Sequence, residues 1–367
     1  MKRSKTASRP RTQPRTLHPG SPMESAKTVE YKGAFRLVNK VAEGGMATVY
    51  EAEQLGPEGF TKRIALKVIH PHYAKREEFL RLFIDEAKLS ANLMHGNVVQ
   101  IYQLGEVGGE YFIAMEYIQG PTLRSVIDRH YDMGSPIPAT LAAYICSRVS
   151  RALDFAHNFV SPAGQRLDIV HRDVSPGNVM ITWDGHIKLA DFGIAKAKTS
   201  FDPASEQKMR IGKKHYMSPE QVLGSSVDGK SDVFSLGVVL YELLALSPLF
   251  REEETGLLVD EVAVQPLPNL RARITDLDKG LEEVLHGALQ RSPSKRATAA
   301  QFASSLDAWV SLQNEAASPD RLQSHLVQLF PTTYAARTRE ETSFGNLRGA
   351  IAKPRGSTSI LKKLFGS

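Results

Sequence analysis

The residue types best suited to chemistry are concentrated between positions 171 and 193. The segment HRDVSPGN ends at Asn178, and thirteen residues later the chain reads DFG, beginning at Asp191. Two short apolar segments that read as a strand pair, VMIT and HIKLA, lie between them, so the carboxylates of Asp173 and Asp191 and the amide oxygen of Asn178 can converge on one point. Oxygen ligands of this kind suit Mg²⁺, which makes Asn178 and Asp191 the predicted metal ligands. Asp173 is then left to accept a proton from an attacking hydroxyl.

Two further features could bind phosphate groups. Residues 41–49, VAEGGMATV, place two glycines between strand-like segments, where backbone N–H groups can approach phosphates closely because no side chain intervenes. A flexible β-turn would explain the same letters. Lys67 lies in an apolar strand, and a buried lysine is unfavourable unless it is paired; the candidate partner is Glu86, in the helical stretch that follows. Taken alone, these two residues would more simply be surface charges.

Hydrophobic periodicity predicts the elements that position these residues. Strand-like segments punctuated by glycines lie at 31–54, 61–70, 98–105 and 110–118. Helical segments lie at 76–94, 138–159, 232–246 and 281–289. The order of these segments predicts a small β-rich lobe followed by a larger helical lobe.

With its chemical motifs in this order, the chain resembles the protein kinase superfamily over residues 31–317, in particular the bacterial eukaryotic-like (Hanks-type) serine/threonine kinases with an H-R-D-V-S-P loop. Three further stretches carry the resemblance. YMSPE at 216–220 stands where the family has A-P-E, SDVFSLG at 231–237 matches the buried helix whose aspartate steadies the catalytic loop, and Arg296 matches the arginine that pairs with the glutamate of A-P-E. AMEYI at 114–118 resembles the hinge that binds adenine through backbone groups.

The resemblance implies an α+β, bilobal protein kinase fold. Its N-lobe, residues 31–118, would be a small antiparallel β-rich unit with one regulatory helix, and its C-lobe, residues 119–317, would be larger and mainly helical. The implied activity is the ATP- and Mg²⁺-dependent phosphorylation of Ser and Thr hydroxyls on proteins, including autophosphorylation, in bacterial signalling.

The resemblance also implies the roles of individual residues. Lys67, paired with Glu86, would hold the α- and β-phosphates of ATP, Asp173 would orient the substrate hydroxyl, and Asn178 and Asp191 would hold the metal ions. The residues implied in ATP binding are Val41, Ala42, Glu43, Gly44, Gly45, Met46, Ala47, Thr48, Val49, Ala65, Lys67, Met115, Glu116 and Ile118.

Two departures from the family pattern bear on the mechanism. Ala42 and Ala47 replace glycines of the usual G-x-G-x-x-G loop, which predicts a stiffer loop. Ser175 stands where serine/threonine kinases usually have a lysine that contacts the γ-phosphate, and Lys213 stands where they usually have a threonine. We hypothesise that Lys213 supplies the missing cation to the catalytic site; the alternative is a solvent-facing Lys213 that binds acidic substrate.

The segment between the DFG and SPE motifs is a candidate for regulation. Thr199, Ser200 and Ser205 lie among basic residues, and a phosphate on this segment could pair with Arg172 and order it. The alternative is a segment that is ordered without modification.

Other functions can be weighed against this one. Residues 224–231, GSSVDGKS, match the phosphate-loop pattern of P-loop NTPases, but a proline turn precedes them where a real P-loop requires an apolar strand. A catalytically weak kinase-fold scaffold that binds nucleotide and partners is the more serious alternative, although such proteins usually lose Lys67, Asp173 or the DFG aspartate, all present here. Tyrosine specificity is disfavoured because the catalytic segment lacks the A-A-R or R-A-A insert of tyrosine kinases.

Composition restricts the partners and the compartment. The 367 residues carry a net charge of +6, but residues 1–30 and 318–367 each carry +5 and residues 31–317 carry −4. A nucleic-acid-binding protein would more often have a basic folded domain, so no nucleic-acid partner is expected. One cysteine excludes an intrachain disulfide and a multi-cysteine zinc site. No run of 18 apolar residues and no secretory signal is found, which predicts a cytoplasmic enzyme without a transmembrane segment.

The two ends read as basic tails. Residues 1–30, rich in Pro, Ser, Thr and Arg, are predicted to be disordered. In 318–367, apolar residues at 322, 326, 329 and 330 predict a short amphipathic helix that packs against the helical lobe or, as second choice, docks a partner. ILKKLF at 360–365 could contact a membrane surface or a partner groove, although a frayed tail is the simpler expectation for so short a segment.

Overall fold

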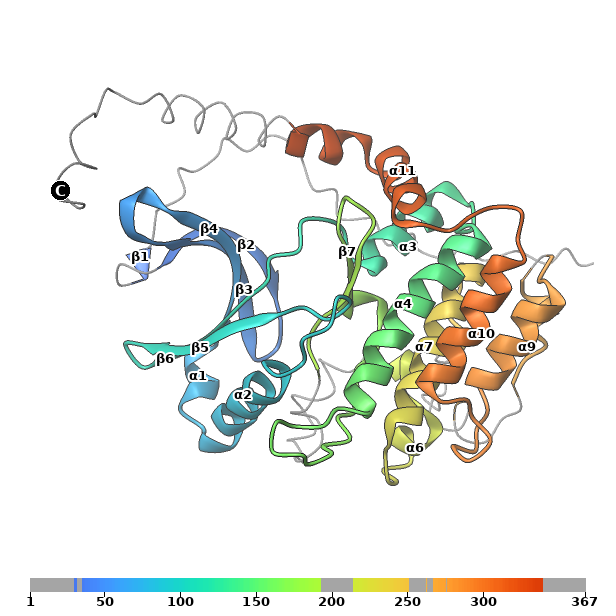
Figure 1. Ribbon diagram of the computed structural model, residues 1–367, viewed down its shortest axis with the longest axis horizontal. Helices are drawn as coiled ribbons and strands as arrows, with labels where there is room; N and C mark the ends of the chain where they lie inside the picture. The colour runs from blue at the N-terminus through green and yellow to red at the C-terminus, as the bar shows by residue number, and fades with distance from the viewer. Residues whose placement is uncertain are drawn as a thin grey trace, which may run out of the picture.

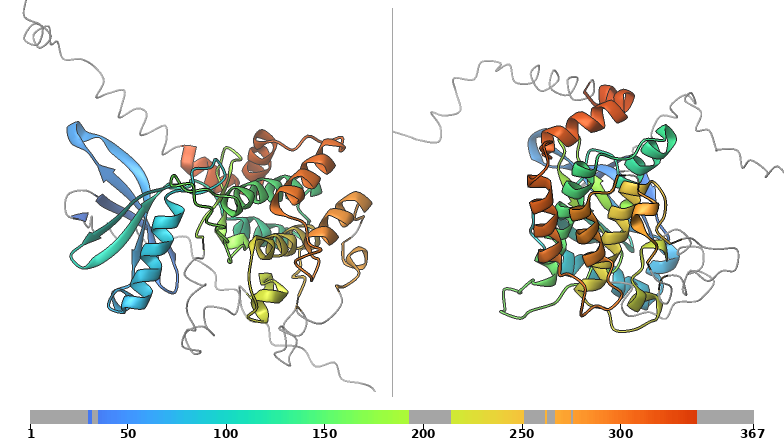
Figure 2. Two further views of the ribbon diagram at one scale, coloured as in Figure 1. Left: turned by 60° about the horizontal axis from the view of Figure 1, so that its bottom comes forward. Right: turned by 90° about the vertical axis from the view of Figure 1, so that its right-hand side faces the viewer.

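The computed structural model describes residues 30–31, 35–192, 214–250, 262, 267–274 and 276–338. The chain forms two lobes, a small one built on a β-sheet and a larger one built from helices (Figure 1). Figure 2 shows the sheet and one long helix on one side of the molecule and the helical bundle on the other. The α+β, bilobal arrangement predicted from the sequence is therefore confirmed.

The small lobe is an antiparallel sheet covered on one face by helix α2. Its strands are β1 (Glu30–Tyr31), β2 (Phe35–Glu43), β3 (Ala47–Leu55), β4 (Thr61–Ile69), β5 (Ile101–Val107) and β6 (Glu110–Met115). They lie in the order β1-β2-β3-β4-β6-β5, with neighbouring strands antiparallel. The helical elements of this lobe are η1 (Pro57–Gly59), α1 (Pro71–Ala74) and α2 (Glu77–Ser90).

Alternation along β4 determines which way Lys67 faces. Ile64 and Leu66 pack into an apolar cluster on the outer face of the sheet, whereas Ile69 packs against Phe83 of α2 on the other face. Because successive side chains of a strand point to opposite faces, Lys67 shares the face of Ile69 and is directed toward α2.

The large lobe surrounds an almost fully apolar central helix. Its α-helices are α3 (Leu123–Met133), α4 (Ala139–His157), α6 (Pro219–Val222), α7 (Gly229–Ala245), α9 (Lys279–Ala288), α10 (Ala299–Ser311) and α11 (Pro319–Leu329). The 3-10 turns are η2 (Pro176–Asn178), η4 (Lys214–Tyr216) and η5 (Leu270–Ala272), and the hairpin strands are β7 (Val179–Ile181) and β8 (Ile187–Leu189). Helix α7 is buried from Ser231 to Leu244, as expected of a helix that is apolar all round.

Side-chain caps determine where several of these helices begin. Thr122, Asp278 and Thr298 each accept a hydrogen bond from a first-turn N–H group of α3, α9 and α10, respectively. Thr298 and Gln301 also form a reciprocal capping box. Such caps satisfy N–H groups that have no partner within the helix.

Helix α11 lies beyond residue 317, where the sequence predicts the C-lobe to end. Its Leu322, Leu326 and Leu329 are buried in the core of the large lobe, which confirms the packing predicted for this amphipathic segment. No helix among residues 30–31, 35–192 and the described part of 214–338 combines the length and the apolar character needed to cross a membrane. Residues 1–29, the segment with Thr199, Ser200, Ser205 and Lys213, and residues 360–365 lie outside the described part of the chain.

Candidate active site

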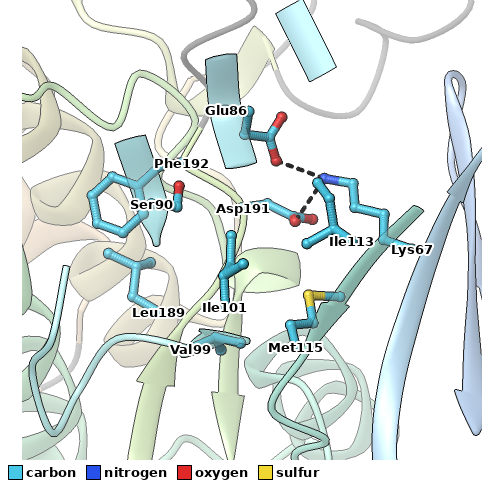
Figure 3. Close-up of a pocket in the computed structure, with 10 residues that line it drawn as sticks. All are labelled: Lys67, Glu86, Ser90, Val99, Ile101, Ile113, Met115, Leu189, Asp191 and Phe192. Atoms are coloured by element: carbon cyan, nitrogen blue, oxygen red, sulfur yellow. Dashed lines mark hydrogen bonds and ion pairs between the residues drawn. The ribbon is translucent and has the colours of Figure 1, made fainter. Parts of the chain in front are cut away.

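Lys67 connects the two lobes through ion pairs (Figure 3). Its Nζ lies 2.7 Å from Oε1 of Glu86 on α2 and 2.9 Å from Oδ1 of Asp191, which follows β8. The Lys67 and Glu86 side chains are 15% and 13% exposed, whereas that of Asp191 is 42% exposed. The structure thus brings together three residues that the sequence predicts for one site, from a strand, a helix and a loop.

The charges in this cluster shift the pKa values of its members. Burial alone would lower the pKa of Lys67, but the negative charges of Asp191 and Glu86 outweigh it and raise that pKa well above its ordinary value. Burial raises the pKa of Glu86, against the opposing effect of the Lys67 charge. Lys67 is therefore a permanent cation at neutral pH.

A buried carboxylate holds the backbone of the 171–178 segment. Asp232, in the first turn of α7, accepts hydrogen bonds from the backbone N–H groups of His171 at 2.8 Å and Arg172 at 2.7 Å. Its Oδ2 also lies 2.8 Å from Nε2 of His157. Asp232 is 1% exposed, and a buried carboxylate of this kind requires such partners. The contacts keep Arg172 in the left-handed region, with φ of 64°, where a non-glycine residue is strained.

His171 links this segment to the residue before Asp191. Its Nδ1 accepts a hydrogen bond from the backbone N–H of Asp173 at 3.2 Å, and its Nε2 lies 3.0 Å from the backbone oxygen of Ala190. Burial lowers the pKa of His171. A neutral ring protonated on Nε2 satisfies both contacts.

Asn178 links the predicted catalytic residue Asp173 to the residue before the predicted metal ligand Asp191. Its Nδ2 donates to the backbone oxygen of Asp173 at 2.8 Å and to the Asp173 carboxylate at 3.1 Å. Its backbone oxygen accepts from the N–H of Ala190 at 2.9 Å, next to Asp191. Because Asp173 engages the amide nitrogen, the amide oxygen is the group that can face a cation. An amide oxygen and a carboxylate are ligands that suit Mg²⁺.

Phe192 lies beneath α2. It is 2% exposed, and its ring centroid lies 4.7 Å from that of His171. A small pocket opens beside it, between the sheet, α2 and β8 (Figure 3). The residues that line this pocket are Lys67, Glu86, Ser90, Val99, Ile101, Ile113, Met115, Leu189, Asp191 and Phe192. Met115, one of the residues implied in ATP binding, lies on its wall.

The predicted phosphate loop, residues 41–49, comprises the end of β2, the turn and the start of β3. The N–H of Gly44 donates to the backbone oxygen of Ala47 at 2.9 Å, and the methyl group of Ala47 is buried in the cluster that includes Phe83 of α2. Two hydrogen bonds fix the loop from the end of β4: His70 N to the Met46 oxygen at 2.8 Å, and His70 Nε2 to Thr48 Oγ1 at 3.0 Å. The loop is therefore anchored where the family usually has a glycine.

The predicted hinge begins at the end of β6. Ala65 lies opposite Met115 in the sheet, and Ile118 is buried. Glu116 donates its backbone N–H to the Gln100 oxygen at 2.8 Å, and its Oε2 lies 2.9 Å from Nζ of Lys188 on β8. These contacts direct the Glu116 side chain toward β8.

The predicted pair of Glu220 and Arg296 is present in the core of the large lobe. The Nη1 and Nη2 atoms of Arg296 lie 2.6 and 3.1 Å from the Glu220 carboxylate. Burial alone would raise the pKa of Glu220, but hydrogen bonds from Arg296 and Ser231 lower it below its ordinary value. Residues 224–231 follow helix α6, with no strand before them, so this segment does not form the P-loop that its letters resemble.

Several residues around the site carry no signal in the sequence. The pocket residues of β5 and β8 read as ordinary core positions, and His70 lies 22 residues from its partner Thr48. Ser175, which replaces the usual lysine, is 4% exposed. Lys213, its hypothetical substitute, and Gly193 lie outside the described residues.

Comparisons with known proteins identify the family of this chain. The protein kinase domain family model matches residues 35–306. Tyrosine-protein kinase MasK of Myxococcus xanthus is 38% identical over 307 residues, which cover 81% of this chain and 46% of MasK. Serine/threonine-protein kinase PrkC of Bacillus subtilis is 33% identical over 264 residues, 72% of this chain and 38% of PrkC. This chain thus spans less than half the length of these relatives.

A solved structure shows the same fold. The kinase domain of PknI from Mycobacterium tuberculosis is 29% identical, with a TM-score of 0.57. The match covers 76% of this chain and 97% of the PknI chain.

Proposed function

This chain belongs to the protein kinase domain family, and from that premise we propose that it transfers the γ-phosphoryl group of ATP to Ser and Thr hydroxyls on proteins, with Mg²⁺, in bacterial signalling. Its own Ser and Thr residues are among the expected acceptors. The observation that supports this most directly is the convergence of Asp173, Asn178 and Asp191 beside the Lys67–Glu86 pair.

The roles of the residues follow from their positions. Asp173, held by Asn178, orients the acceptor hydroxyl and accepts its proton. Lys67, a permanent cation, holds the α- and β-phosphates, and Glu86 fixes its direction. The 41–49 loop covers the phosphates, while Ala65, Met115 and the hinge around Glu116 and Ile118 surround the adenine.

The amide oxygen of Asn178 and the carboxylate of Asp191 are the groups that would hold Mg²⁺. They fit this ion because both are hard oxygen donors, and the hydrogen bond from Ala190 N to Asn178 O ties their two segments together. The ion neutralises charge on the phosphates when bound. The protein's own contribution is to position the acceptor and the phosphates.

Lys213 is proposed to supply the cation that Ser175 does not. Ser175 has a neutral hydroxyl, so that position presents no charge to the γ-phosphate. Lys213→Ala should reduce kcat strongly, and Lys214→Ala, one residue along the chain, is the matched control. Near-normal kcat in Lys213→Ala would refute this role.

The acceptor residue needs a direct test because the relatives' names differ. MasK is named a tyrosine kinase and PrkC a serine/threonine kinase. Incubation of the purified chain with Mg²⁺, ATP and matched peptides that differ only in a central Ser, Thr or Tyr should phosphorylate the Ser and Thr peptides. Modification of the Tyr peptide alone would overturn the proposed specificity.

A catalytically weak scaffold is the alternative. It predicts ATP binding without transfer to any of the three peptides. Retention of Lys67, Asp173 and Asp191 favours the enzyme. The disordered tail (1–30), the bounds of the kinase domain (31–317), the docking of partners as a second role of the C-terminal tail (318–367), whose α11 packs on the large lobe, and a location in the cytoplasm remain predictions.

A further inference from the structure

The segment 319–338 lies beyond the match to the family model, which ends at residue 306, yet it packs tightly on the large lobe. It consists of α11 and the helical residues 331–338. In Figure 1 it lies along α3 and over the hairpin of β7 and β8. It therefore contacts α3 and the hairpin that lies between Asn178 and Asp191 in the chain.

Its contacts with α3 are polar and specific. Nε2 of His325 lies 2.9 Å from Nε2 of His130, and the two rings stack with centroids 5.1 Å apart. Nε of Arg129 donates to the backbone oxygen of Leu329 at 3.3 Å. These contacts fix both the position and the end of α11.

Its contacts with the hairpin centre on Trp183, which is 6% exposed. The Trp183 ring meets Phe330 and Tyr334 edge to face, with centroids 6.2 and 5.6 Å apart. Gly185, in the same turn with φ of 77°, approaches Pro319 so closely that a β-carbon there would overlap the Pro319 carbonyl. The turn and the segment are thus in direct contact at two places.

The hairpin is also held by the chain that leaves the hinge. Ile181 N donates to the Pro121 oxygen at 2.9 Å, and Trp183 N donates to the Gln119 oxygen at 3.0 Å. The hairpin therefore contacts both residues 119–121 and the segment 319–338. Its first strand begins directly after Asn178, and its second ends two residues before Asp191.

We propose that the segment 319–338 positions the catalytic metal ligands by clamping the β7–β8 hairpin, with Trp183, Phe330 and Tyr334 as positioning residues. The segment holds the turn at one end of the hairpin, and Asn178 and Asp191 lie at the other. Loss of the clamp lets the hairpin open more often without unfolding the lobe. The role of the metal in this inference rests on the proposed function, whereas the mechanical coupling does not.

Hydrogen exchange of the full chain tests the coupling without any assay of activity. Tyr334→Ala should speed the exchange of amides in β7 and β8 about tenfold. Tyr144→Ala is the matched control, because Tyr144 is also a partly buried tyrosine that packs on the core of the large lobe. Arg148 lies over the Tyr144 ring as Arg337 lies over the Tyr334 ring. Equal exchange of β7 and β8 in the two variants would overturn the proposal.

Glycine substitutions test the contact from the side of the hairpin. Gly185→Ala and Gly164→Ala introduce the same left-handed strain, since their φ angles are 77° and 78°, but only at Gly185 does the new methyl group meet another residue within 4 Å. Gly185→Ala alone should speed exchange in 319–338. Equal effects of the two substitutions on that segment would contradict the contact.

Enzymatic measurement then separates the clamp from the proposed function. In Tyr334→Ala the Mg²⁺ concentration for half-maximal activity should rise about three- to tenfold with little change in KM for the peptide. If Tyr334→Ala changes exchange but not Mg²⁺ dependence in an active enzyme, the hairpin is clamped but the metal ligands are not positioned by it, and that part of the inference is wrong. Absence of transfer in the wild-type chain would instead refute the proposed function.

Discussion

The ammonium group of Lys67 lies 2.9 Å from a carboxylate oxygen of Asp191, so that an ion pair joins β4 of the small lobe to the segment that follows β8 in the large lobe. Glu86 approaches the same ammonium from α2 at 2.7 Å. One cation therefore links β4 and α2 of the small lobe to Asp191 of the large lobe. Predictions about activity can be made from the residues that surround it.

Glu86→Gln should impair catalysis, because a neutral amide cannot form the ion pair that holds the Lys67 ammonium group, and Asp191 then remains its only anionic partner in this cluster. We expect kcat/KM for ATP to fall about 30- to 100-fold, equivalent to about 2–3 kcal/mol. Glu77→Gln, on the same helix but 86% exposed, is the control and should leave kcat/KM unchanged. An equal, small effect of both substitutions would argue against a role for the Lys67–Glu86 pair.

Thr48→Val should weaken ATP binding, because it removes the hydrogen bond from the phosphate loop to His70. One such bond contributes about 1 kcal/mol, so KM for ATP should rise about fivefold with little change in kcat. Thr48→Ser should retain the wild-type KM, because it keeps the hydroxyl that bonds to His70. If His70→Ala does not reproduce the effect of Thr48→Val, the hydrogen bond is not the cause.

Ser90→Ala should stabilise the protein. The Ser90 hydroxyl is buried and has no hydrogen-bond partner among the described residues, so its removal relieves a desolvation cost of about 1 kcal/mol. Differential scanning calorimetry should show a Tm higher by about 2 °C. Ser147→Ala should do the opposite, because the Ser147 hydroxyl donates to Asp307. A lower Tm for Ser90→Ala would mean that this hydroxyl has a stabilising partner.

Acid should weaken the attachment of α11. Burial, together with the charges of His130 and Arg321, lowers the pKa of His325 from 6.5 to about 4. Between these two pKa values the unfolded chain binds a proton at His325 that the folded chain does not bind. The free energy of unfolding therefore has the full contribution of a neutral His325 above about pH 6.5 and loses it as the pH falls toward 4. Urea unfolding between pH 7 and 4.5 should therefore show a smaller loss of stability for His325→Gln than for the wild type. Parallel curves would exclude a neutral, buried His325.

The sequence predicted those site residues whose role few other amino-acid types can fill. Asp173, Asn178 and Asp191 could be recognised because metal and proton transfer restrict the residue types, and the pairing of Glu220 with Arg296 followed from the family pattern. The contact of Thr48 with His70 could not be predicted, because hydroxyl and imidazole groups occur on many exposed turns and only the register of β3 and β4 brings these two together. The packing of Tyr334 on Trp183 depends in the same way on how α11 lies across the hairpin.

Phosphoryl transfer by Asp173→Asn is the most direct measurement of the central claim. The wild type and the variant, each with Mg²⁺ and ATP, are compared by mass spectrometry of a Ser/Thr peptide and of the chain itself. Asp168→Asn, five residues earlier and exposed, is the control. We expect phosphate on Ser or Thr residues with the wild type and with Asp168→Asn, and transfer at least about 100-fold slower with Asp173→Asn, because the acceptor hydroxyl loses the group that orients it. Equal transfer by the wild type and Asp173→Asn would contradict the assignment of this site as the active site of a protein kinase.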